Sequence, residues 1–118
     1  MGEFRAYLDQ ARKFQAQADY RSAERSLMLA LEAATQLYND PALVAEALQM
    51  LSLFYRQMGQ RNEALAQADW ALQMLKAKLG QQHVGLKPVL LAMAGLLKED
   101  GQLQEAVIVE KEAAALKG

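Results

Sequence analysis

The chain of 118 residues contains no cysteine, which excludes disulfide cross-links and thiolate metal sites. Proline is also scarce, with two residues in the whole sequence. The residues that favour strands are few: five valines, one isoleucine and one threonine stand against 22 alanines and 20 leucines. Because strong helix formers dominate, the composition predicts an all-α fold with a few long helices.

Neither sign of charge is in excess, since 13 basic and 14 acidic side chains give a formal net charge of −1. A chain without a basic field is not expected to bind nucleic acid. The first ten residues lack the apolar stretch of a secretory signal, and the uncharged run from Val89 to Leu97 is too short to cross a bilayer. We therefore expect one cytoplasmic domain over residues 1–118 that does not contact a membrane.

The sequence offers little material for catalysis. His83 is the single histidine, and without cysteine or clustered carboxylates it cannot form a convincing metal site or activate a nucleophile. No Gly-Lys follows Gly80 or Gly85, so a phosphate-binding loop is not indicated either. We expect a protein that is not an enzyme and holds no cofactor or metal, with His83 in a linker that caps the fifth helix.

Three segments of the chain align with one another and begin at Phe14, Tyr55 and Leu97. Small residues recur in register as Ala11, Ser52 and Ala94, then as Ala23, Ala64 and Ala106, and again as Ala30, Ala71 and Ala113. The middle set has spacings of 41 and 42 residues. Small side chains at fixed points let two helices cross closely, so we expect these alanines to be buried.

The breaks in the pattern predict six helices, over residues 3–17, 20–37, 41–58, 61–79, 84–99 and 102–117. The sequence Asn39-Asp40-Pro41 is typical of a helix cap followed by proline at the first helical position. Pro88 lies in the first turns of the fifth helix and is expected to delay its start. The helices pair into three hairpins, approximately 3–38, 41–79 and 84–117.

The pattern of small residues resembles the tetratricopeptide repeat. The second segment carries it most fully, as Ser52, Tyr55, Gly59, Ala64 and Ala71. In the first segment, Ala18 replaces the turn glycine. The period exceeds the usual length of about 34 residues and is similar to the longer variant found in kinesin light chains and many bacterial proteins. The resemblance implies a right-handed superhelical array of three antiparallel helix hairpins, with HEAT-like repeats as the alternative.

In that family the first helix of each pair lines a concave groove, so the resemblance implies a non-catalytic module for protein–protein interaction. Carried over by position, the groove residues are Arg5, Leu8, Arg12, Gln49, Leu53, Arg56, Leu91 and Lys98, with Ala92, Gly95 and Glu99 among their neighbours. The leucines would form an apolar floor, and the basic residues would form one wall against Asp9, Glu46 and Glu99. Such a groove suits an extended peptide with acidic and apolar side chains. An ordinary solvated helix face of mixed charge is the alternative.

The last predicted helix contains Val107-Ile108-Val109, three consecutive apolar residues. Ile108 and Val109 fall outside the stripe that is expected to face inward, which comprises Leu103, Ala106, Glu110, Ala113 and Ala114, with Val107 beside it. We hypothesise that Ile108 and Val109 pack against a second copy in a homodimer. Coverage by further repeats of a longer array and simple exposure of two aliphatic side chains remain alternatives. A structural, self-associating role is therefore the second functional hypothesis, and an all-helical enzyme or regulator with a ligand pocket is the third.

Overall fold

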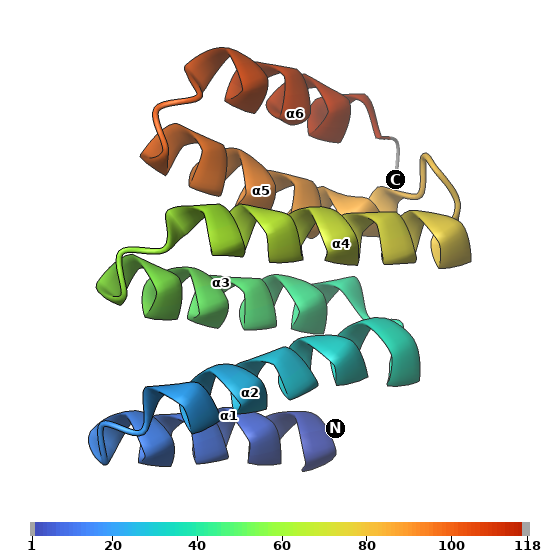
Figure 1. Ribbon diagram of the computed structural model, residues 1–118. Helices are drawn as coiled ribbons and strands as arrows, with labels where there is room; N and C mark the ends of the chain where they lie inside the picture. The colour runs from blue at the N-terminus through green and yellow to red at the C-terminus, as the bar shows by residue number, and fades with distance from the viewer. Residues whose placement is uncertain (1, 117–118) are drawn as a thin grey trace.

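The computed structural model describes residues 2–116 of the chain (Figure 1). The α-helices in this part are α1 (Gly2–Ala16), α2 (Tyr20–Glu32), α3 (Pro41–Gln57), α4 (Arg61–Leu79), α5 (Lys87–Glu99) and α6 (Leu103–Ala115). A π-helical turn, η1 (Ala33–Leu37), extends α2, and a 3-10 turn, η2 (Val84–Leu86), precedes α5. Residues 2–116 contain no β-strand, which confirms the all-α prediction and its six helices.

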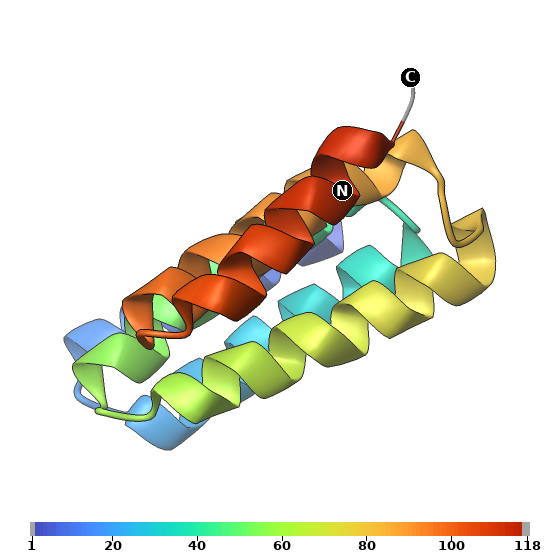
Figure 2. The same ribbon diagram turned by 90° about the horizontal axis from the view of Figure 1, so that it is seen from above.

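The helices stack side by side in chain order, and each runs antiparallel to the one before it (Figure 1). Seen from above, α2 and α4 lie on one side of the molecule, while α3 and α5 lie on the other (Figure 2). Helix α3 packs against both α4 and α5, and α6 packs against α5. The result is a slab with extents of 43 × 32 × 17 Å. The slab therefore has two broad faces, and the first and last helices lie at its two ends.

Local capping sets where the helices begin. The Asp40 carboxylate accepts a hydrogen bond of 3.0 Å from the backbone N–H of Ala42 and caps α3, with proline at its first position, as predicted. Pro88 lies in the first turn of α5, and the chain forms η2 before that helix starts, so the expected delay is confirmed. The Nδ1 atom of His83 accepts from the N–H of Gly85 at 2.9 Å, so this histidine caps η2 rather than α5 itself.

The turns after α1, α3 and α5 share one hydrogen-bond pattern. The backbone N–H groups donate from Asp19 to Phe14 (2.8 Å), from Gln60 to Tyr55 (2.7 Å) and from Gln102 to Leu97 (2.8 Å). This pattern is a Schellman motif, which requires a left-handed residue just before each donor. The φ angles there are +59° at Ala18, +72° at Gly59 and +79° at Gly101. Ala18 therefore adopts the backbone conformation that glycine supplies in the other two turns.

The core is continuous along the slab and is built from alanine, leucine and a few aromatic residues. Ala23, Ala64 and Ala106 are at most 2% exposed, which confirms that these matched alanines are buried. Tyr55 is fully buried, and its hydroxyl donates a hydrogen bond of 2.6 Å to the Glu24 carboxylate of α2. Burial, and then the adjoining Glu24, raise the pKa of Tyr55 above the usual tyrosine range.

Candidate functional site

A hollow of about 420 Å³ follows the seam between α3 and α5. Its lining residues are Leu48, Gln49, Ser52, Leu53 and Arg56 of α3, and Leu91, Ala92, Gly95, Leu96 and Glu99 of α5. Helices α3 and α5 run in the same direction (Figure 1). Because Gln49 and Leu91 are early lining residues of these two helices in chain order, both lie toward one end of the hollow. Arg56 and Glu99 lie toward the other end. The structure thus brings together Gln49, Leu53, Arg56 and Leu91 from the predicted groove.

Two leucines leave much of their apolar surface open at this hollow. Leu53 of α3 is 51% exposed and Leu91 of α5 is 50% exposed. Leu48 and Leu96 are buried and form the apolar base between the helices. A partner that covered the open half of both exposed leucines would gain about 1 kcal/mol from each, half of what full burial of such a side chain contributes.

Gly95 lies one helical turn after Leu91 on the same face of α5. A Cβ atom at this position would have no heavy atom within 4 Å outside its own turn of helix and its chain neighbours. Glycine inside a helix costs about 1 kcal/mol relative to alanine. The neighbouring helices therefore do not require a glycine here, and its effect is to deepen the hollow.

Leu8 does not belong to this surface, contrary to the sequence-based expectation. It is 1% exposed and lies in the hydrophobic core. Phe4, Leu8 and Ala11 recur at the i, i+4, i+7 spacing of a helix stripe, and all three are buried. The placement of Leu8 by its repeat position was wrong because this apolar stripe of α1 decides which face turns inward. The spacing of the three residues was the signal in the sequence that could have placed Leu8 in the core.

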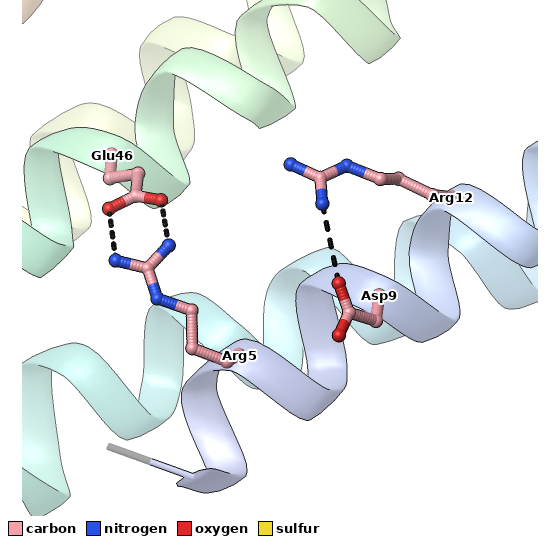
Figure 3. Close-up of polar contacts among 4 residues, drawn as sticks. All are labelled: Arg5, Asp9, Arg12 and Glu46. Carbon is pink, nitrogen blue, oxygen red and sulfur yellow. Dashed lines mark hydrogen bonds and ion pairs between the residues drawn. The ribbon is translucent and has the colours of Figure 1, made fainter.

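Arg5 and Arg12 of α1 lie outside the hollow, and each is paired with a carboxylate (Figure 3). Arg5 forms two hydrogen bonds to Glu46 of α3, one of them 3.1 Å between Nη2 and Oε1. The hydrogen bond to Glu46 raises the pKa of Arg5 above its usual value. Arg12 contacts Asp9 of its own helix at 3.3 Å. Arg5 thus links α1 to α3.

Arg56 of α3 and Lys98 of α5 are paired with carboxylates as well. Arg56 forms an ion pair with Glu99, so the polar end of the hollow is bridged by opposite charges. Lys98 contacts Glu110 of α6 at 2.7 Å and does not line the hollow. Each of the four basic residues predicted for the groove therefore already has a carboxylate partner. The expected basic wall is electrically balanced within the chain.

The opposite end of the hollow carries uncharged hydrogen-bonding groups. Gln49 is exposed, and the structure gives its side-chain amide no hydrogen-bond partner among residues 2–116. Ser52 lies deeper in the same wall and is partly buried. An amide can both donate and accept, so Gln49 can bind the N–H and C=O groups of a peptide backbone. Ser52 was expected at a helix crossing, and its spacing gave no sign that it also lines the hollow.

The outer surface of α6 differs in detail from the expectation. Ile108 is 59% exposed, as predicted, whereas Val109 is half-buried and packs against the core. Leu103, which was expected to face inward, is 62% exposed, and Val107, which was placed beside the inward stripe, is 46% exposed. Helix α6 is therefore turned so that its open apolar surface, the α6 patch, consists of Leu103, Val107 and Ile108. The prediction that Val109 lies outside the core was wrong.

Within the described part of the chain, no group of three or more histidine, aspartate or glutamate side chains is placed to hold a metal ion. None of the helices between residues 2 and 116 combines the length and apolar character needed to traverse a bilayer. No protein-family model matches the chain, and no curated protein matches it at a significant level.

Proposed function

We propose that this protein is a non-catalytic interaction module that binds a peptide segment of another protein along the seam between α3 and α5. The observation that carries the proposal is the hollow there, with Leu53 and Leu91 half-exposed on its two sides. Binding sites are concave and mostly apolar, with a few polar groups that orient the ligand. This hollow combines an apolar base with Gln49 at one end and a charged pair at the other.

We further propose that the six helices form a right-handed superhelical array of three hairpins, similar to tetratricopeptide repeats. Two observations support this arrangement. The turns at Ala18, Gly59 and Gly101 repeat one hydrogen-bond pattern, and matched alanines are buried at the same intervals. In such an array each hairpin contacts its neighbours, so a seam between successive first helices runs along one face.

The structure of the hollow favours apolar side chains in the bound peptide more than it favours acidic ones. Arg56 and Lys98 are each paired with a carboxylate, which leaves little net charge to hold an acidic partner. Acidic residues in the partner would change the rate of association and its dependence on salt more than the affinity. Affinity should come from apolar side chains that cover Leu53 and Leu91.

A selection from a phage-displayed library of random peptides, followed by fluorescence anisotropy with the enriched peptides, tests this proposal. Replacing Leu53 and Leu91 together by serine should weaken binding roughly 30-fold, the equivalent of about 2 kcal/mol. Ile108→Ser is the matched control, because Ile108 is an equally exposed aliphatic residue on α6, and it should leave binding unchanged. Enriched peptides that bind the double variant as tightly as wild type would refute the groove.

Self-association is the second candidate function, favoured by the α6 patch. Open apolar surface of this kind often marks an interaction site. Sedimentation velocity at high micromolar concentration should then show a wild-type dimer and a monomeric Ile108→Glu variant. A wild-type chain that remains monomeric under these conditions would rule out the homodimer.

A further inference from the structure

We propose that Gly95 opens a notch in the α5 side of the α3–α5 hollow, and that this notch receives one bulky apolar side chain of the bound peptide. The peptide residues on either side of that side chain would be uncharged. This inference rests on the proposed peptide-binding function and specifies its ligand. The anchor side chain would be aliphatic or aromatic, such as leucine or phenylalanine. Its backbone would approach α5 at the position where that helix carries no side chain.

Among the described glycines, Gly2 and Gly95 have neither a positive φ nor a close neighbour at the position of a Cβ atom. Gly2 is the first residue of α1, whereas Gly95 lies inside α5 and lines the hollow. Gly59 and Gly101 occupy left-handed turns. A Cβ atom at Gly85 would lie 2.9 Å from Nδ1 of His83, so this position has no room for a side chain. Gly95 has a helical backbone and open space around it. Glycine weakens a helix, and Gly95 is required neither by a left-handed backbone nor by a lack of room for a Cβ atom. We therefore infer that its role is to let the backbone of a bound molecule approach α5 closely.

The surroundings of Gly95 select an apolar group. Leu53 and Leu91 flank the hollow with half of their surface open, and Leu48 and Leu96 close its base. The hollow of about 420 Å³ exceeds the roughly 150 Å³ in which a protein cavity binds benzene, so a leucine or phenylalanine side chain fits. Among the residues that the structure describes, the titratable groups that line the hollow are the Arg56–Glu99 pair at its end.

The charges around the notch favour a peptide whose residues next to the anchor side chain are uncharged. Arg56 and Glu99 already neutralise each other, so a charged residue of the peptide beside them would repel one partner while it attracted the other. At the opposite end, the Gln49 amide can donate to a backbone carbonyl and accept from a backbone N–H. The occupant that fits these groups is a neutral peptide segment with one large apolar side chain.

Short acetylated and amidated peptides of alanine, serine and glycine, with one central guest residue, test the notch directly. The guests are alanine, leucine, phenylalanine and glutamate, and each peptide is titrated into 15N-labelled protein and followed by amide chemical shifts. The leucine and phenylalanine peptides should bind about tenfold more tightly than the alanine peptide and shift the Gly95 amide. The glutamate peptide should bind no more tightly than the alanine peptide.

Gly95→Leu fills the notch from within and should lower the affinity for the leucine peptide about tenfold, to the level of the alanine peptide. Its melting temperature should not fall, because leucine is a better helix former and the space is open. Ala66→Leu adds the same side chain to the exposed face of α4 and should bind like wild type. If Gly95→Leu fails to fold, Gly95→Ala replaces it and should weaken the leucine peptide several-fold.

The outcomes separate the notch from the groove. If Gly95→Leu binds the leucine peptide as tightly as wild type, while serine at Leu53 and Leu91 weakens it, the notch is refuted and the groove stands. If the glutamate peptide binds as tightly as the leucine peptide, the apolar anchor is refuted. If no guest peptide shifts any amide along α3 or α5, both the notch and the groove are refuted.

Discussion

Ala18→Gly is expected to stabilise the protein, although glycine usually weakens helical proteins. Ala18 has φ +59° in the turn between α1 and α2, and the matching turns have glycine at this position. Its side chain is exposed, so removing the methyl group uncovers no packed surface. The substitution therefore isolates the backbone strain at one residue.

The magnitude follows from two opposing terms. An alanine in the left-handed region costs roughly 1–2 kcal/mol relative to glycine. The greater freedom of glycine in the unfolded chain offsets about 0.4–1 kcal/mol of that gain. We therefore expect the free energy of unfolding to rise by about 0.5–1 kcal/mol, which corresponds to about 2–4 °C in melting temperature for a domain of this size.

Thermal and urea unfolding, followed by far-ultraviolet circular dichroism, measure this change. The same substitution at Ala66, an exposed residue inside α4, is the matched control and should destabilise by about 1 kcal/mol. The reverse change, Gly59→Ala, should also destabilise, because it introduces the strain that Ala18 carries. A melting temperature that falls in Ala18→Gly as it does in Ala66→Gly would refute the left-handed conformation of this turn.

Two further predictions concern the core. Tyr55→Phe removes the hydrogen bond to Glu24 and should lower the free energy of unfolding by about 1–2 kcal/mol at neutral pH. Because the folded pKa of Tyr55 is raised, wild type should lose stability above about pH 10, where the unfolded tyrosine ionises, and urea unfolding at rising pH should show a smaller loss in the variant. Ala64→Phe should overpack its buried site and cost about 1–3 kcal/mol, with Ala66→Phe near neutral in the same melting experiment.

The fold was predictable from the sequence where its determinants are local. Asp40 and the proline after it mark the start of α3, and Gly59 and Gly101 mark two of the turns. Pro88 shifts the start of α5 through its own ring and missing N–H. These signals lie within a few residues of the structure that they produce, so the helix boundaries could be read to within a few residues.

The site was less predictable because it depends on how each helix is turned about its own axis. Leu8 and Leu91 occupy matching repeat positions, yet the first is buried and the second is half-exposed. The rotation of α1 is decided by its whole apolar stripe, and repeat position alone does not contain that information. The sequence placed Arg56 and Glu99 in one groove but did not predict that they form an ion pair, because they are 43 residues apart on separate helices. Only the packing of α3 against α5 brings them together.

If a partner docks on the α6 patch, we expect that contact to be weaker than the junctions inside the stack, and the residues at matching repeat positions explain why. Leu27 and Leu31 of α2 are buried in the helix that packs against α3, and Leu72 of α4 is buried beside α5. The matching positions of α6 hold Glu110 and Ala114, of which the first is already paired with a lysine of α5. The position that matches Glu110 holds Leu27 in α2 and Ala68 in α4, and the position that matches Ala114 holds leucine in both helices. A partner of α6 therefore meets a carboxylate and less apolar bulk than these positions provide inside the stack. Association through α6 should for this reason be reversible by dilution, whereas the contacts between α3 and α5 persist as long as the chain is folded.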